Sequence, residues 1–256
     1  MTKEQFRALI TAPETVRRVK QAREALERGD RKAYDNLKKG LPFVIFIATY
    51  AETLSEKSQK MGAWRKQAAC QLNGLCVIDF DHVDEGENNP NPNDNPNPNL
   101  NLNPNDNLNL NPNPKRSLRE IWDEAYARLS DEDKKRILFV YVTPSGHGLK
   151  VVFVADAAVG NLIDNQMVFS RKLGLNPDEC CKDASRGAFL TTSEDVLLID
   201  EERLISYQDD DFGAKYNEAY HQGKSQPTLK AESGERSAES LSEVDSAPSA
   251  SNSQLE

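Results

Sequence analysis

The sequence predicts an α+β fold, because segments with strand composition and segments with helix spacing both occur along it. Residues 74–81, 137–143 and 149–155 are apolar runs rich in β-branched or aromatic residues, which is typical of buried strands. Residues 161–173 repeat apolar side chains at helical spacing, which indicates an amphipathic helix. Together these segments predict a sheet with helices packed against it.

Shorter signals predict the remaining elements. Ser117 and Glu120 form a capping box, which opens a helix running to about Leu129. A polar helix opens the chain, and Pro13 begins another that Thr11 could cap. The other expected elements are helices over residues 13–26 and 32–39, a strand over 43–48, a short helix around 64–70, and short strands around 188–192 and 196–199.

Charge is distributed unevenly along the chain. The net charge of −9 comes from residues 194–256, which hold 15 acidic and 5 basic residues, whereas residues 1–193 hold 26 acidic and 27 basic residues. Residues 1–40 alone hold 11 basic and 6 acidic residues, so the N-terminal helices are basic. A basic face can contact phosphates and an acidic tail can compete with them, although ordinary solvated helix faces give the same pattern.

Two segments are expected to be disordered. Asparagine occupies every odd position of residues 89–113, alternating with Pro, Leu and Asp. Because such a repeat cannot pack a core, residues 88–114 are expected to be an insertion in a surface loop, where extra length costs little. Residues 221–256 are expected to be a disordered acidic tail. The expected divisions are therefore a basic helical segment at residues 1–40 and a domain at residues 41–220.

Composition also limits the class of protein. No run of about 18 apolar residues exists, so no membrane span is expected, and the N-terminus lacks the apolar core of a signal peptide. The four cysteines, Cys70, Cys76, Cys180 and Cys181, have no zinc-site spacing and suit reduced thiols in a cytoplasmic protein.

Asp79 and Asp81 end the apolar run at residues 74–81. Residues two apart in a strand point to the same face, so these carboxylates should converge where the strand leaves its sheet. Two hard oxygen ligands side by side form half of a Mg²⁺ or Mn²⁺ site, and two such ions can support phosphoryl transfer. A strand that simply ends in solvated aspartates has the same spacing, so this motif alone leaves both interpretations open.

Residues 143–150 form a second candidate site. Gly146 and Gly148 allow backbone N–H groups to cradle an anion, Ser145 adds a hydroxyl donor, and Lys150 adds a positive charge. The alternative is a plain glycine hairpin turn, with Lys150 as an outward strand residue and His147 as a bystander.

Residues 178–190 form a third candidate site. A carboxylate from this segment could complete a two-metal site, and Arg186 could clamp a triphosphate with both of its terminal nitrogens. The alternative is a polar loop in which Asp183 and Arg186 merely pair with each other.

The three segments together are more specific than any one of them. Their order is an apolar strand with Asp-x-Asp, then Pro-Ser-Gly-x-Gly-Leu-Lys before a strand, then Lys-Asp-x-Ser-Arg before a strand. This order resembles the N-terminal domain of virulence-associated protein E-like replication proteins of Bacteroidetes mobile elements, which looks like a member of the archaeo-eukaryotic primase superfamily. The resemblance covers residues 41–200 and includes Leu41 and Pro42.

The resemblance implies a primase or primase-polymerase with an RRM-like antiparallel sheet flanked by helices, and a smaller α/β part that closes over the nucleotide. Asp79 and Asp81 would be the first metal-binding motif. The wider superfamily has a histidine at the position of Lys150, so a proton-sharing role is in doubt there, while His147 lies at a variable position. The implied nucleotide-binding residues are Ser145, Gly146, Gly148, Lys150, Asp183 and Arg186.

The resemblance also implies a third metal ligand, Asp178, with Asp183 as the runner-up. Mg²⁺ or Mn²⁺ held by Asp79, Asp81 and Asp178 would stabilise both oxygens while a 3′-hydroxyl attacks an α-phosphate. The implied partners are nucleoside triphosphates and a single-stranded DNA template. Template binding would fall to Arg17, Arg18, Arg65 and Lys66.

The chain departs from its expected relatives in one respect. They usually continue into a helicase-like ATPase domain, whereas no Gly-x-x-x-x-Gly-Lys-Ser/Thr motif occurs here. Either a separate chain supplies the helicase or this chain is a relict. The expected function is primer synthesis for a mobile element. The alternatives are a non-catalytic module that binds nucleic acid or a nucleotide, and a metal-dependent phosphohydrolase or nuclease.

Overall fold

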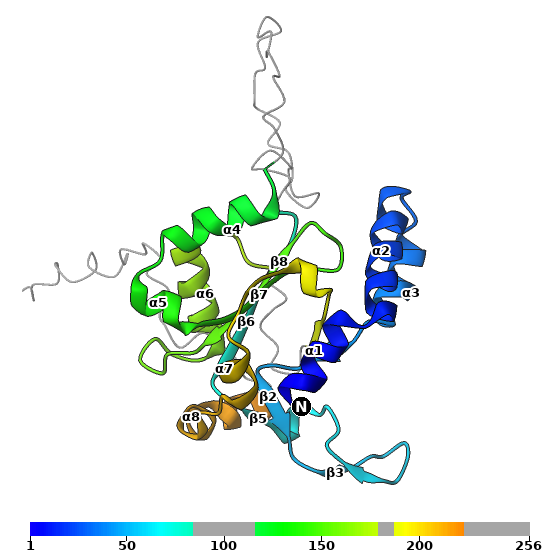
Figure 1. Ribbon diagram of the computed structural model, residues 1–256. Coiled ribbons are helices and arrows are strands. Elements are labelled where there is room, and N and C mark those ends of the chain that lie inside the picture. Colours follow the sequence, from blue (N-terminus) through cyan, green and yellow to red (C-terminus); the bar gives the residue numbers. More distant parts are fainter. Residues whose placement is uncertain (84–115, 179–186, 223–256) are drawn as a thin grey trace, which may run out of the picture.

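The computed structural model describes residues 1–83, 116–178 and 187–222, and it confirms the α+β class. Its largest sheet has four antiparallel strands in the order β10-β7-β8-β6, so β6 lies at an edge of the described sheet (Figure 1). All four strands lie where the sequence predicts them. Their bounds are Leu75–Phe80 (β6), Ile137–Val142 (β7), Leu149–Val154 (β8) and Val196–Ile199 (β10).

Three helices lie between these strands in the sequence and complete a β-α-β-β-α-β order. The capping box of Ser117 and Glu120 opens the first of them, as the sequence predicts, and Asn161 caps the last. The middle helix consists of six charged residues and has no apolar period, which is why sequence spacing does not reveal it. Their bounds are Leu118–Ala127 (α4), Asp131–Arg136 (α5) and Leu162–Leu173 (α6).

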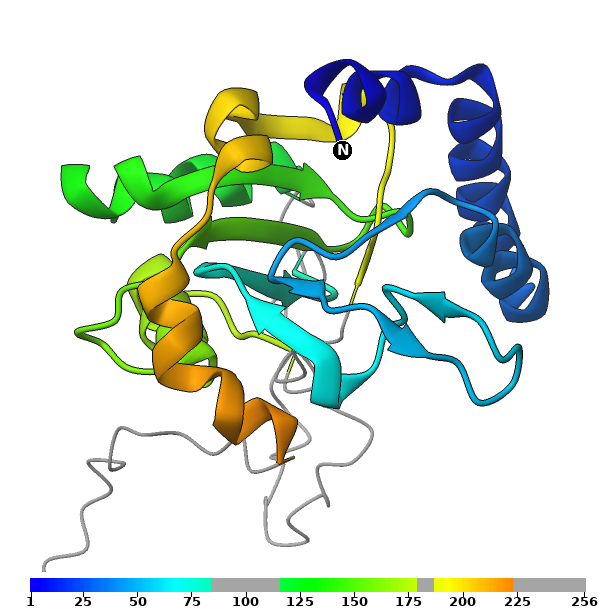
Figure 2. The same ribbon diagram turned by 90° about the horizontal axis from the view of Figure 1, so that it is seen from below.

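The N-terminal segment forms three helices: α1 (Lys3–Thr11), α2 (Pro13–Glu27) and α3 (Arg31–Lys39). Figure 2 shows the α2–α3 pair on the side of the molecule where the β7–β8 turn also lies. The expected cap at Thr11 is wrong. Thr11 ends α1 and its hydroxyl donates to a carbonyl within that helix, so Ala12 precedes α2 without a side-chain cap.

The side chains of β6 alternate between two cores. Ile78 and Phe80 belong to the core that includes α4 and α6. Leu75 belongs to the core on the opposite face of the sheet, which includes Phe6 of α1. Asp79 shares the face of Leu75 because strand residues alternate. The acidic end of β6 therefore lies on the face away from α4 and α6.

The segment between α3 and β6 forms short paired strands in place of one long strand. The strand expected at residues 43–48 is interrupted because its two ends pair with different partners, β1 with β9 and β2 with β5. The expected helix at residues 64–70 is also wrong: only a 3₁₀ turn forms at Gln67–Ala69, because the next residues join β2. The bounds are Phe43–Val44 (β1), Ala48–Tyr50 (β2), Thr53–Leu54 (β3), Met61–Gly62 (β4), Cys70–Leu72 (β5) and Ala188–Phe189 (β9).

Two further helices, α7 (Glu201–Ser206) and α8 (Asp210–His221), follow β10 and were not expected from the sequence. Phe212, Tyr216 and Tyr220 of α8 join the core that contains α4 and α6. Among the described residues, no helix has the length and apolar character needed to cross a membrane. The expected disordered insertion at residues 88–114 lies outside the described residues, as do residues 223–256 of the tail expected at 221–256. The expected start of that tail is wrong, because α8 continues to His221.

Candidate active site

Asp79 and Asp81 line one cavity, as the alternation of strand residues predicts. Asp79 is the penultimate residue of β6, and Asp81 follows the end of the strand. The cavity has a volume of about 570 Å³, which lies within the usual range for small-molecule sites. Its walls come from the end of β6, the β7–β8 turn, helices α2 and α3, and residues at β9. This cavity is the candidate active site.

Lys150 lies directly opposite Asp79 in the ladder between β6 and β8, and its ammonium group forms an ion pair with Oδ2 of Asp79. Only 8% of the Lys150 side chain and 11% of the Asp79 side chain are exposed. A buried carboxylate needs a partner, and Lys150 is that partner here. The sequence analysis expected Lys150 to face phosphate, whereas the structure places its charge on a carboxylate.

The turn at residues 143–148 brings Gly148 against the end of β6. A Cβ atom at Gly148 would lie 2.6 Å from the carbonyl oxygen of Phe80 and 3.3 Å from Oδ1 of Asp81, so only glycine fits without a shift. Gly146 has φ +81°, a backbone conformation that glycine adopts without strain. The two glycines therefore fix the distance between the turn and the acidic strand end.

The amide groups of this turn are partly used within it. The N–H of Gly146 donates to the carbonyl of Thr143 at 2.9 Å, and the N–H of His147 donates to Oγ of Ser145 at 3.3 Å. The Ser145 hydroxyl also lies 3.0 Å from the Thr143 hydroxyl. A phosphate cradle that uses the Gly146 amide, as the sequence suggested, would require this turn to open.

Asp178 reaches the same strand from the loop after α6. Its N–H donates to the carbonyl oxygen of Asp79 at 2.8 Å. Burial raises the pKa of Asp81, the charges of Asp79 and Asp178 raise it further, and Lys150 opposes them. Asp178 therefore lies close enough to influence Asp81, but it lines the neighbouring cavity and not the one that Asp79 and Asp81 line. Asp183 and Arg186, the remaining residues of this motif, lie outside the described residues.

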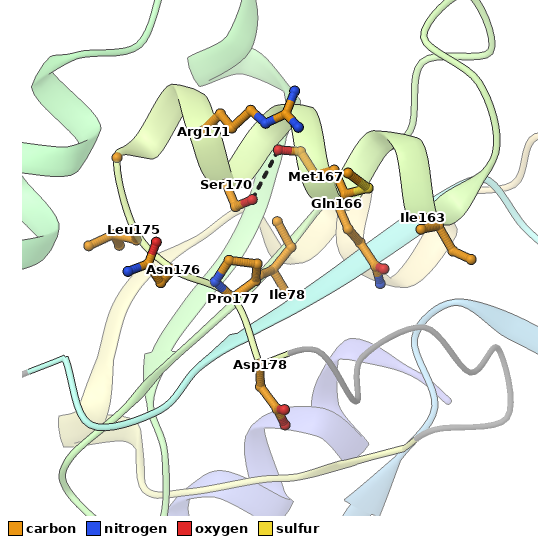
Figure 3. A pocket seen from close by; sticks show the side chains of 11 residues that line it. Ile78, Ile163, Gln166, Met167, Ser170, Arg171, Leu175, Asn176, Pro177 and Asp178 are labelled. Atoms are coloured by element: carbon orange, nitrogen blue, oxygen red, sulfur yellow. Dashed lines mark hydrogen bonds between the residues drawn. The ribbon is translucent and has the colours of Figure 1, made fainter. Parts of the chain in front are cut away.

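A second cavity of about 610 Å³ lies on the other side of β6, between α6 and residues 174–178 (Figure 3). Ile78 lines it from β6, and Gln166 and Ser170 line it from α6. In Figure 3 the carboxylate of Asp178 points away from these two α6 side chains. This cavity lacks the paired acids of β6, so the cavity at Asp79 and Asp81 remains the candidate active site.

Sequence analysis did not assign the wall that α3 contributes. Arg31, Tyr34 and Lys38 line the cavity together with the predicted acids. Arg31 and Lys38 lie over the ring of Tyr34, at 5.1 Å and 5.6 Å from its centroid. The available sequence signal was a tyrosine three residues after one cation and four before another, which share one helix face.

The three acids have the chemistry of a divalent-cation site, since carboxylate oxygens are the ligands that Mg²⁺ and Mn²⁺ prefer. Burial is the main cause of the raised pKa of Asp81, and the charges of Asp79 and Asp178 add to it, so a bound cation would be stabilised by these acids. Within the described ranges, no group of three or more His, Cys, Asp or Glu side chains is already arranged to hold a metal ion. The residues therefore fit the ion by chemistry, and Asp79 could join it only by sharing or releasing Lys150.

The chain was compared with models of protein families, with curated proteins and with solved structures. None of these comparisons found a match. The features that bear on function are therefore the geometry of the cavity and the order of the motifs that form it.

Proposed function

We propose that this chain is a metal-dependent nucleotidyltransferase of the primase type, which makes primers on single-stranded DNA for a mobile genetic element. One observation carries the proposal: two motifs far apart in the sequence line one cavity. The acidic strand end supplies Asp79 and Asp81, and the glycine turn supplies Ser145. Gly148 packs closely on Phe80, so the turn and the acidic strand end lie at a short distance that a larger residue would change.

The proposed reaction joins a 3′-hydroxyl oxygen to the α-phosphorus of a nucleotide, and the bond to the leaving pyrophosphate breaks. Positioning and charge neutralisation would supply most of the catalysis. A divalent ion held by Asp79, Asp81 and Asp178 would supply positive charge to the attacking and leaving oxygens. Ser145 would donate its hydroxyl to a phosphate oxygen, and Lys150, once released from Asp79, would be available for the same phosphates.

The primase-like part of the proposal draws on the order of elements in the sheet. A β-α-β-β-α-β order is that of ferredoxin-like and RRM-like sheets, which supports the expected RRM-like core. The edge position of β6 is a departure, because the first strand of those sheets pairs on both sides.

A template strand would bind beside the cavity on the β3–β4 hairpin. Leu54, Met61 and Trp64 are exposed there, and bases stack on exposed aromatic rings. Arg65 lies over the ring of Phe43, 5.5 Å from its centroid, which links the hairpin to β1. Arg17 and Arg18 instead form ion pairs with Glu14 on their own helix, which favours an ordinary solvated face for these two arginines.

The experiment that tests the proposal is primer synthesis on single-stranded DNA with labelled nucleotides and Mn²⁺ or Mg²⁺. The wild-type chain is expected to extend products, and Asp79→Ala/Asp81→Ala is expected to make none. A folded wild-type chain that makes no product under either ion would contradict the proposal.

A second candidate function is a non-catalytic module that binds a nucleotide or nucleic acid through the same cavity. The ion pair between Lys150 and Asp79 favours it, because an ammonium group holds a carboxylate that catalysis would need. Nucleotide binding without synthesis, unchanged by Mn²⁺, would support this module. A nuclease or phosphohydrolase would leave Lys150 away from the acids. The contact of Lys150 with Asp79 therefore disfavours this alternative.

A further inference from the structure

We infer that α3 forms the polyphosphate-binding wall of this cavity, with Arg31 and Lys38 contacting the β- and γ-phosphates of a nucleoside triphosphate. This inference rests on the proposed function and names residues that the motif order did not. It also gives the N-terminal basic segment a specific role at the site, in place of a general affinity for phosphates.

Two cations of this wall contact the ring of Tyr34. Arg31 lies 5.1 Å and Lys38 lies 5.6 Å from the centroid of the Tyr34 ring, and Lys38 is also 5.7 Å from the ring of Phe189. Aromatic faces attract cations and orient them. Both cations also line the cavity, so an anion bound there would be stabilised by two positive charges.

Charges of both signs line the cavity. Lys150 is paired with Asp79 in this structure, so α3 supplies further positive charge that does not depend on breaking that pair. Arg31 has a weak partner in Asp35, 3.7 Å away and exposed, and Lys38 forms no ion pair with an acid in the described part of the chain. Glu27 is the acid on this wall. An exposed pair of this kind contributes little and yields readily to a better partner.

The wall is anchored to the glycine turn. Tyr34 is 2% exposed. Burial raises its pKa, Arg31 lowers it, and the nearby charges of Asp35 and Asp81 raise it. Arg23 of α2 donates to Oδ1 of Asp195 at 2.9 Å and to the carbonyl of Thr143 at 3.4 Å. The hairpin of α2 and α3 therefore holds its cations at a defined position relative to the turn.

This arrangement matches the chemistry of a metal–triphosphate complex. The acids on the β6 side suit the cation of that complex, and Arg31 and Lys38 suit phosphate oxygens that the cation does not cover. A monophosphate contacts fewer of these groups, so the wall should discriminate by phosphate number.

Calorimetric titration of the full chain with dATP and with dAMP, in Mg²⁺, tests the inference. The test variant is Arg31→Gln/Lys38→Gln. The control is Lys32→Gln/Lys39→Gln, which removes the same charge from exposed positions on the same helix that do not line the cavity. We expect the Kd for dATP to rise at least about 10-fold in the test variant and to stay within about 2-fold in the control. Binding of dAMP should change less.

The outcomes separate the inference from the proposed function. Equal dATP affinity in wild type and test variant overturns the inference alone, as does an equal loss in test and control variants, which would indicate a long-range charge effect. Wild type that binds no dATP overturns the proposed function as well. Thermal unfolding of all three proteins within about 2 °C excludes misfolding.

Discussion

Asp79 and Asp133 are both buried carboxylates that contact a lysine, but their surroundings differ in sign. Asp133 of α5 accepts hydrogen bonds from Lys172 at 2.8 Å on both oxygens, from Ser130 at 3.0 Å and from Arg136 at 3.4 Å. Asp79 contacts Lys150, and its own charge and that of Asp178 both act on the neighbouring Asp81. One carboxylate is surrounded by donors, and the other belongs to a group of acids.

The pKa values of Asp133 and of Asp81, which lies beside Asp79, shift in opposite directions. Burial alone would raise the pKa of Asp133, but hydrogen bonds from Lys172 and Ser130 outweigh it, so the pKa is lowered. Burial also raises the pKa of Asp81, and there the nearby acids add to the increase. Where the basic side chains of a cluster neutralise its acids, no further ion is needed. Where acids outnumber nearby cations, a bound cation would be stabilised. The sign of the neighbouring charges, more than burial, distinguishes the candidate site from a structural ion pair.

The largest expected effect is on catalysis. It should appear when the acids at Asp79 and Asp81 are replaced and not when Asp133 is replaced. Asp79→Asn/Asp81→Asn should reduce primer synthesis at least about 100-fold, since even outer residues of metal sites contribute 10- to 100-fold. Asp133→Asn, measured at a temperature where it stays folded, should retain activity within about 2-fold. Because Asp79→Asn leaves Lys150 buried beside a neutral amide, Asp81→Asn alone serves as the second variant. Comparable losses at both clusters would mean that the assay reports stability.

The next effect concerns added metal. If the acids near Asp81 bind Mn²⁺ in the folded state only, Mn²⁺ at 100 times its Kd should stabilise the chain by about 2.7 kcal/mol. The measurement is thermal unfolding with Mn²⁺ and then with EDTA. Asp81→Asn should lose most of this gain, and Asp133→Asn should keep it. An equal gain in all three proteins would place the ion elsewhere.

A smaller effect is expected at the structural cluster. Asp133→Asn should lower the free energy of unfolding by about 2 kcal/mol, because charged hydrogen bonds to Lys172 and Arg136 are lost while Ser130 keeps a partner. Denaturant unfolding measures this value. A matched replacement of the exposed Asp131 in the same helix should change it by less than about 0.5 kcal/mol.

The strands that carry the site could be predicted from sequence because they are long, apolar and β-branched. The bounds of β6, β7 and β8 agree with the expected runs, and the alternation within β6 places Asp79 and Asp81 at one cavity. The run at residues 43–48 failed because composition does not reveal pairing partners: its two halves join different strands. Charged α5 gave no period to detect.

The site itself was only partly predictable, since long-range contacts determine it. No local signal indicated that Lys150 would lie opposite Asp79, because that contact depends on the register between β6 and β8. The contribution of Tyr34 depends on how α3 packs against the β7–β8 turn. Sequence could name the acids and the glycine turn, but it could not show which cation neutralises which acid.

The smallest expected effect is a change in stability whose direction distinguishes Asp81 from Asp133. Asp81→Asn should raise the free energy of unfolding at pH 7, by less than about 1 kcal/mol because Asp81 is exposed and solvent screens its charge. An aspartate whose folded pKa is raised destabilises the fold above that pKa, and the penalty disappears as pH falls through it toward the unfolded value. The advantage of Asp81→Asn should therefore vanish by about pH 4.

Asp133 should show the opposite dependence, because its folded pKa is lowered. Its stabilising contribution is complete above the unfolded pKa, so the deficit of Asp133→Asn should persist at pH 4 and fade only at lower pH, as the folded carboxylate takes up its proton. Denaturant unfolding from pH 7 to pH 3 measures both variants against wild type. If Asp81→Asn were less stable than wild type across this range, Asp81 would be a structural carboxylate like Asp133, and the excess of negative charge that argues for a bound cation would be gone.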